Sequence, residues 1–170
     1  WGRLDIVVNN AGILRDRMFA SGSAEEWDAV MRVHLRGHFC TSRIAAAHWR
    51  EQSKAGKRVD ARIINTSSGA GLLGSVGQSA YSAAKAGIAA LTLVQAAELA
   101  RYGVTANAIA PAARTRMTEA VFAQTMAKPE PGRHTTLPPE DVAPLVVWLG
   151  SAESHAVTGR VFEVEGGKIS

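Results

Sequence analysis

The segment Tyr81-Ser82-Ala83-Ala84-Lys85 places a phenol and an ammonium four positions apart. On a helix, this spacing brings the two side chains onto one face. A free tyrosine has a pKa near 10, and a neighbouring cation lowers it toward the range in which acid–base catalysis is efficient. We therefore predict that Tyr81 exchanges a proton with a substrate and that Lys85 lowers the pKa of Tyr81. A chance pair on a helix surface has the same spacing, so the pair alone leaves both interpretations open.

Two more polar segments follow predicted strands. Ser68 comes just after the predicted strand Arg62–Asn65, and Asn9-Asn10-Ala11-Gly12 follows the predicted strand Leu4–Val8. The carboxyl ends of parallel strands form the edge of a sheet at which ligands bind. At that edge the Ser68 hydroxyl can bind a substrate oxygen, small residues let a flat cofactor approach the backbone, and asparagine amides tie down strands or a ribose. Each segment, taken alone, also fits an ordinary turn.

Short β-rich runs alternate with long helical patterns, which predicts a single α/β domain over residues 1–170 with a parallel sheet. The expected strands are Leu4–Val8, Arg62–Asn65, Val104–Ile109 stopped by Pro111, and Arg160–Val164 ending at Gly166-Gly167. The expected helices are 24–52, capped by Ser23 and interrupted near Gly37, 79–102 with Gly103 just after it, and 139–150. Residues 69–77 are expected to form a Gly/Ser-rich loop, 113–128 a loop and short helix, and 128–139 a loop.

Composition narrows the function classes. The net charge is +4, but basic residues are scattered among acidic ones with few aromatics, which favours a solvated surface over a nucleic-acid interface. The single cysteine, Cys40, excludes an internal disulfide, fits a reducing cytoplasm and is expected to be packed. The apolar stretches are interpreted as too short to span a bilayer, and no signal-peptide pattern or metal-ligand cluster is recognised. We therefore expect a cytoplasmic protein without a metal, nucleic-acid or membrane partner.

The combination of Asn9-Asn10-Ala11-Gly12, Ser68 and Tyr81-x-x-x-Lys85 resembles the short-chain dehydrogenase/reductase family. Asn107-Ala108-Ile109-Ala110-Pro111 and Gly166-Gly167 extend this resemblance over essentially the whole chain. It implies a Rossmann-like doubly wound parallel sheet and an oxidoreductase that moves a hydride between a nicotinamide cofactor and a hydroxyl or carbonyl carbon.

The resemblance also implies roles for single residues. Tyr81 would exchange the proton on the substrate oxygen, Lys85 would lower the pKa of Tyr81 and bind the nicotinamide ribose, and Ser68 would orient the substrate. The cofactor-binding residues implied by the family's motifs are Asn10, Ala11, Gly12, Tyr81, Lys85, Pro111, Ala113 and Thr115. The substrate would contact Ser68 and Tyr81.

The chain departs from the family's pattern in two places. His34, in Val33-His34-Leu35-Arg36-Gly37, stands where the family usually has an asparagine of its proton relay, and either a relay or a packing role fits a histidine. The segment after Pro111 is shortened to Ala112-Ala113-Arg114-Thr115. With 13–17 and 162–164, these features resemble the branch of (3R)-hydroxyacyl-CoA dehydrogenases, which includes peroxisomal multifunctional enzymes and acts in fatty acid or steroid metabolism.

The family's Gly-rich dinucleotide turn is absent from the sequence. We therefore expect only the second half of the Rossmann sheet here, with the pyrophosphate site upstream of Trp1. NAD is the expected cofactor, and NADP stays open because the residue that would choose between them is also absent. Without neighbours, the strand at 4–8 becomes a bare apolar edge, so the 170 residues alone are expected to fold poorly and bind cofactor weakly.

The expected substrate is a 3-hydroxyacyl-CoA. A 3-oxoacyl-carrier-protein reductase or a steroid dehydrogenase of the same fold is the near alternative, and a non-catalytic binding subunit is the distant one. A homodimer or homotetramer through the two long helices is implied by the resemblance, and the nearly all-apolar helix around residues 88–100 also requires cover on more than one side.

Overall fold

The computed structural model describes residues 2–115 and 137–170. Its centre is a five-stranded sheet in the order β1-β2-β3-β4-β5. The strands are β1 (Ile6–Asn9), β2 (Ala61–Thr66), β3 (Val104–Ala112), β4 (Val161–Glu165) and β5 (Lys168–Ile169). The pairs from β1 to β4 are parallel, and β5 is antiparallel to β4. The predicted α/β fold with a mostly parallel sheet is confirmed.

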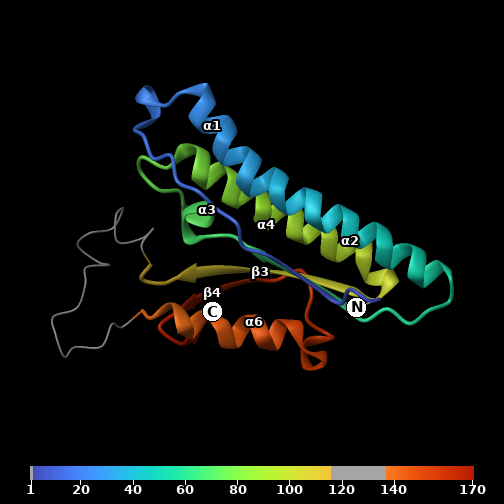
Figure 1. The fold of residues 1–170 in the computed structure, drawn as a ribbon. Coiled ribbons are helices and arrows are strands. Elements are labelled where there is room, and N and C mark those ends of the chain that lie inside the picture. Colours follow the sequence, from blue (N-terminus) through green and yellow to red (C-terminus); the bar gives the residue numbers. More distant parts are fainter. Residues whose placement is uncertain (1, 116–136) are drawn as a thin grey trace.

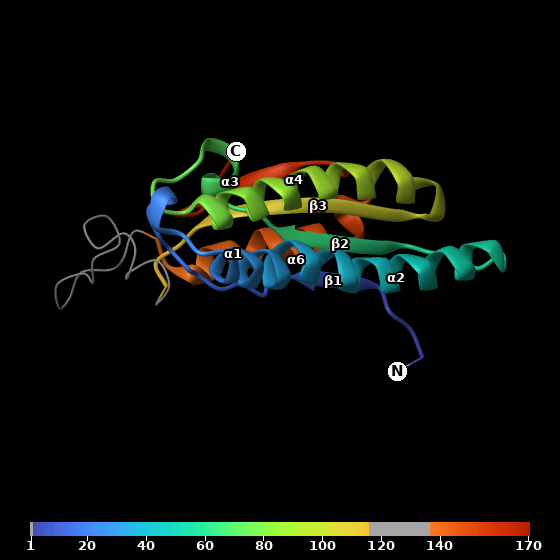
Figure 2. The same ribbon diagram turned by 90° about the horizontal axis from the view of Figure 1, so that it is seen from above.

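Helices cover both faces of this sheet (Figure 1, Figure 2). On one face lie α1 (Ala24–Met31), the π-helical turn η2 (Arg32–Arg36), α2 (Gly37–Lys54) and α4 (Ser79–Leu99), and on the other lies α6 (Ala143–Gly150). The short helical elements are η1 (Phe19–Ser21), α3 (Gly69–Leu73), η3 (Ala100–Tyr102), η4 (Pro139–Val142) and η5 (Ala152–Ser154). The predicted helix over 24–52 exists, and its irregularity is the π-helical turn that ends just before Gly37.

Strand β2 forms the core because it is buried along its whole length. Ile63 packs with Trp49 and Ala106 on the side of α2, whereas the next residue, Ile64, packs with Leu149 on the side of α6. This alternation follows from the strand period of two, and both faces of the strand are covered by helices.

The prediction that Pro111 stops the third strand is wrong, because β3 continues to Ala112 and pairs Pro111 with Val164. Ala108 N donates to Arg160 O, so alternate residues of β3 bond toward β4 and the nitrogen of Pro111 faces the side of β2. There β2 has already ended at Thr66. The missing N–H of Pro111 therefore removes no ladder hydrogen bond.

Helix α4 with η3 corrects the expectation about membrane spans. By length and composition alone, Ser79–Tyr102 is long and apolar enough to cross a bilayer. It packs against the sheet and buries Ile88, Thr92 and Lys85, and 39% of its most apolar window is buried inside the structure. Its end is as predicted: Gly103 follows it with a positive φ of 79°, a conformation that favours glycine.

The structure also tests the expectations for the first strand, for Cys40 and for residues 69–77. Strand β1 lies at the edge of the sheet, as predicted, with Leu4, Ile6 and Val8 exposed. Cys40 is exposed on α2 rather than packed, because it lies on the outer face of that helix. Residues 69–73, expected to form part of a loop, form the short helix α3. The expectations for 116–136 lie outside the described residues.

Candidate active site

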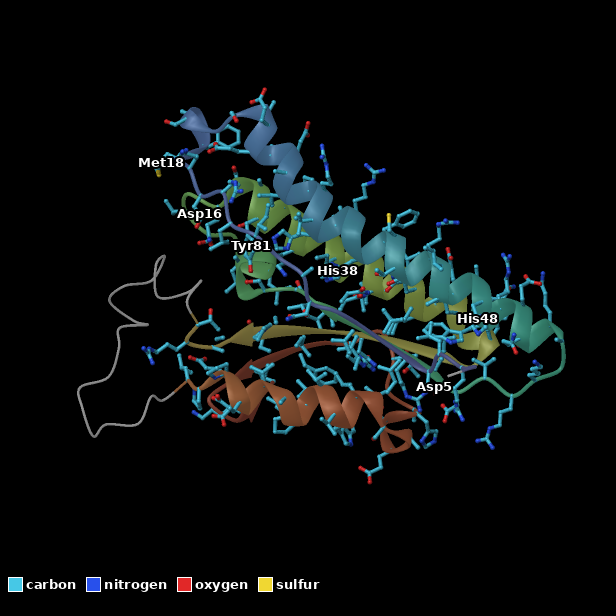
Figure 3. The ribbon with its side chains drawn as sticks, viewed as in Figure 1. Asp5, Asp16, Met18, His38, His48 and Tyr81 are labelled. Carbon is cyan, nitrogen blue, oxygen red and sulfur yellow. The ribbon has the colours of Figure 1, made fainter. Side chains whose placement is uncertain are left out.

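Ser68, Tyr81 and Lys85 meet at one end of the sheet. Ser68 follows β2, and Tyr81 and Lys85 lie one turn apart in α4. The Lys85 Nζ lies 5.4 Å from the centre of the Tyr81 ring, and the Ser68 side chain lies near enough to the Tyr81 phenol to lower its pKa. Figure 3 shows Tyr81 with Asp16 at one end of the fold, far from Asp5 at the other end. The structure thus brings together the three side chains that the sequence singles out for catalysis.

The pKa of Tyr81 is raised in the structure, not lowered as the pair with Lys85 predicted. Burial raises the pKa of Tyr81 most, the nearby Ser68 side chain lowers it, and the Asp16 carboxylate raises it again. Burial favours the neutral phenol because a phenolate is poorly solvated there. The phenol is therefore protonated at neutral pH and suited to donate a proton.

The ammonium of Lys85 is held at the end of β2. Its Nζ donates a 2.7 Å hydrogen bond to the Thr66 carbonyl, and the side chain is only 3% exposed. Burial lowers the pKa of Lys85 to about 8, because a charged amine loses solvation inside the protein. An ammonium has three donor hydrogens, and the Thr66 carbonyl accepts from one of them. Lys85 therefore brings a positive charge with further donor capacity to the site.

His34 contacts the catalytic tyrosine from the π-helical turn. Its ring meets the Tyr81 ring edge-on at 5.2 Å, and its Nε2 lies 3.0 Å from Ile13 N and 2.8 Å from Ile13 O. Burial is the main cause that lowers the pKa of His34. Its Nδ1 is buried and has no hydrogen-bond partner in the described part of the chain. His34 thus holds the segment after β1 against the tyrosine, which is a packing contact, and its second nitrogen is left for the relay that the sequence also allowed.

Gly12 is needed for this contact. A Cβ at Gly12 would lie 2.7 Å from His34 Cε1, and His34 is fully buried and cannot move away. From its place after β1, Gly12 was expected to let a cofactor approach the backbone closely. The structure adds a second reason, which is the approach of the histidine ring.

Asn9 and Asn10, at the end of β1, were expected to tie strands together or to hold a ribose, and each fits one of these roles. Asn9 ties strands together, since its Nδ2 donates at 2.9 Å to Asn65 Oδ1 on β2. Asn10 and Ala11 are exposed, and the Asn10 Oδ1 accepts from Thr66 Oγ1 at 3.1 Å. Asn10 therefore lies beside the strand end that holds Lys85.

The segment after β3 is the remaining predicted cofactor contact. Pro111 lies within the end of β3 and is partly buried, Ala113 is buried and Thr115 is partly buried. Arg114 N donates to Leu137 O at 2.8 Å, which joins this segment to the start of the C-terminal region. Among the described residues, no group of three or more His, Cys, Asp or Glu side chains is placed to hold a metal ion.

Sequence reasoning missed His38. Its Nδ1 lies 2.7 Å from His34 O and its Nε2 accepts from Thr66 N at 3.3 Å, so the ring bridges the π-helical turn to the end of β2. A carbonyl can only accept, so Nδ1 carries the proton of the neutral ring. Burial first, and then the charge of Lys85, lower the pKa of His38 to about 4. The i, i+4 spacing of His34 and His38 was visible in the sequence, but their partners were not.

Because the neutral His38 ring links the π-helical turn to β2, we expect the protein to lose stability in acid. The pKa of His38 is lowered from 6.5 to about 4 on folding, so its contribution is complete above pH 6.5 and is lost as the pH falls toward 4. His38→Gln keeps a donor and an acceptor without this titration, so its free energy of unfolding should fall less between about pH 7 and about pH 5. Urea unfolding at both pH values measures this. His48→Gln, an exposed histidine on the same helix, is the control and should behave as wild type; an equal acid loss in His38→Gln and wild type would contradict the assignment.

Comparison with known proteins gives consistent matches. The profile of a protein family described as enoyl-(acyl carrier protein) reductase matches residues 1–168. The hydroxyacyl-CoA dehydrogenase ChsB1 of Mycobacterium tuberculosis is 55% identical over 173 residues, which cover 99% of this chain and 54% of that protein. The peroxisomal multifunctional enzyme type 2 of Mus musculus is 46% identical over 169 residues, which cover 99% of this chain and 21% of that enzyme.

A crystal structure shows the same fold. The short chain dehydrogenase from Mycobacterium avium superimposes with a TM-score of 0.85 at 70% identity, covering 99% of this chain and 55% of that one. The chain therefore spans about half the length of this structure and of ChsB1, and a smaller share of the mouse enzyme.

Proposed function

Because the chain belongs to the short-chain dehydrogenase/reductase family, we propose that the complete protein transfers a hydride between a nicotinamide cofactor and a 3-hydroxyacyl-CoA. The arrangement of Ser68, Tyr81 and Lys85 carries the proposal. A phenol that has a serine hydroxyl nearby and lies beside a buried ammonium is suited to exchange a proton with an alcohol or carbonyl oxygen.

The residues present fit the nicotinamide–ribose end of the cofactor. Lys85 brings spare donors for ribose hydroxyls, and the exposed Asn10 and Ala11 leave the adjacent backbone open to a flat ligand. Gly12 follows the end of β1, and Pro111, Ala113 and Thr115 lie at or just after the end of β3. A cofactor bound there would supply or accept the hydride. Either NAD or NADP suits these contacts, and we propose NAD.

The chain's own residues handle the proton. In reduction, the Tyr81 phenol donates its proton to the carbonyl oxygen as that oxygen becomes negative, and Ser68 donates a hydrogen bond to the same oxygen. In oxidation, Tyr81 accepts the proton of the substrate hydroxyl. Lys85 stabilises the resulting phenolate by its charge. The partial burial of Tyr81 keeps water away from the proton that is transferred.

The similarity to a hydroxyacyl-CoA dehydrogenase supports the substrate class. The experiment is to compare kcat/KM of the complete protein for a 3-hydroxyacyl-CoA, an acyl-carrier-protein thioester and a free steroid alcohol, with NAD and with NADP. The proposal expects the CoA thioester with NAD to be turned over best. A preference for the carrier-protein thioester would identify the reductase alternative, to which the family description points. No turnover of any of them would favour a binding subunit.

A second copy of the chain is the proposed partner. Two hollows lie beside α4, one along α2 and the other along α1 and η2, and Phe39, Leu91 and Val94 line both. About half of the Phe39 and Val94 side chains is exposed. We expect these apolar side chains to pack against the same helices of another subunit, as a twofold interface requires. Phe39→Glu should shift the complete protein toward the monomer in sedimentation, and a wild-type protein that sediments as a monomer contradicts the interface.

A further inference from the structure

Helix α3 touches α4 backbone to backbone at Gly71. A Cβ built there would lie 2.6 Å from the carbonyl carbon of Lys85, 2.7 Å from Ala86 N and 2.7 Å from Lys85 Cβ. Such distances are far inside van der Waals contact, and the neighbour is the backbone of a long helix that cannot yield. Only glycine allows α3 to lie this close to the turn that carries Lys85.

A second contact holds the same turn from the other side of Ser68. The Ser67 hydroxyl donates a 2.8 Å hydrogen bond to the Lys85 carbonyl, and Ser67 is 1% exposed. The chain from Ser67 to Gly71 is therefore attached to Lys85 at both of its ends.

Ser68 lies between these two attachments. It is the N-cap residue of α3, and its Oγ accepts from Ala70 N at 3.2 Å. The same side chain lies near enough to the Tyr81 phenol to lower its pKa. The distance between the serine and the tyrosine thus depends on how closely α3 packs on α4.

We propose that Ser67 and Gly71 are positioning residues that fasten Ser68 against Tyr81 by fixing α3 to the Lys85 turn. This inference depends on the proposed function, because it matters for catalysis only if Ser68 and Tyr81 act on the substrate. It adds two residues whose role is to place the serine rather than to contact substrate.

Gly71→Ala should displace α3. Ordinary contact begins near 3.4 Å, so the helix must move by about 1 Å to admit the new methyl group. A misplacement of about 1 Å in a catalytic group can cost about 100-fold in rate. We expect kcat/KM of the complete protein to fall by about this factor, mainly through kcat.

Gly69→Ala is the matched control. It adds the same methyl group to the same helix, where the nearest heavy atom is Glu163 Oε1 at 3.6 Å, and it should keep wild-type kinetics. Ser67→Ala removes the second attachment without a clash, and it should give a smaller loss of the same kind. It keeps the inference testable if Gly71→Ala does not fold.

The pH profile separates positioning from general destabilisation. The nearby Ser68 side chain lowers the pKa of Tyr81, so a displaced serine should move the tyrosine limb of the kcat/KM profile to higher pH. The titratable groups that face Tyr81 are Asp16, His34 and Lys85, and neither variant changes them. Ser68→Ala should move the limb in the same direction.

The outcomes are distinct. Wild-type kinetics in Gly71→Ala and Ser67→Ala, or a loss of activity with an unchanged pH profile, would overturn the inference. If Tyr81→Phe also retained full activity, the proposed function itself would fall. An inactive Tyr81→Phe beside an unaffected Gly71→Ala would remove only the positioning role.

Discussion

Replacing Tyr81 by phenylalanine lowers kcat of the complete protein by about 10²- to 10⁴-fold, the usual contribution of a positioned acid or base. The change removes one oxygen and keeps the ring that meets His34 edge-on. It also removes the hydroxyl whose pKa the nearby Ser68 side chain lowers. Because the packing of the ring is unchanged, the fold and the affinity for cofactor should be retained. Steady-state kinetics together with cofactor titration measure both effects.

Tyr102→Phe is the control for this substitution. Tyr102 is the other tyrosine of the chain, and it lies at the far end of the same helical run, where Arg101 packs over its ring. It should leave kcat unchanged. Full activity in Tyr81→Phe would contradict the acid–base role and revive the interpretation of a non-catalytic subunit.

Replacing Lys85 by methionine should change both activity and the pH dependence of stability. The substitution keeps an unbranched stem and removes the ammonium that binds the Thr66 carbonyl. A hydrogen bond to a charged group contributes roughly 1.5–3 kcal/mol, so kcat/KM should fall by about 10- to 100-fold if the ammonium holds the cofactor ribose. Kinetics at saturating and limiting cofactor would separate this effect from proton transfer.

The buried Lys85 makes the stability of the folded protein rise with pH. Folding lowers the pKa of Lys85 from 10.5 to about 8, so the buried charge destabilises the fold fully below pH 8. Between pH 8 and 10.5 the folded protein has lost this proton while the unfolded chain keeps it, so stability rises with pH. The whole difference corresponds to roughly 3 kcal/mol.

Urea unfolding between about pH 7 and about pH 9.5 tests this, because Lys85→Met should lack part of the rise that wild type shows. The measured quantity is the difference in this rise between wild type and Lys85→Met, because the other titrating groups are the same in both proteins. Lys54→Met, an exposed lysine at the end of α2, should keep the wild-type rise. Identical slopes in wild type and Lys85→Met would contradict the burial of a charged Lys85.

The order of the elements could be predicted from the sequence because its signals are local. A short β-rich run marks a strand such as Ala61–Thr66, and the spacing of four puts Tyr81 and Lys85 on one face wherever the helix packs. Gly103 ends its helix for a reason that belongs to its own backbone, which has a positive φ. The position of Ser68 at a strand end is local in the same way.

What the sequence could not decide depends on groups far apart along the chain. Pro111 continues its strand because β2 ends beside it, and residues 69–73 form a helix because Gly71 lets them pack on Lys85. These outcomes depend on neighbours that only the packed sheet and helices supply.

The chemistry of the site shows the same division. The sequence by itself determined which groups meet, a phenol, an ammonium and a hydroxyl, because strand ends and helix turns place them. Tertiary structure decided their proton affinities: burial raises the pKa of Tyr81 and lowers that of Lys85, against the expectation from the pair alone. The physical reason is that spacing along a helix fixes the distance between two groups, whereas the cost of a charge depends on everything that replaces water around it.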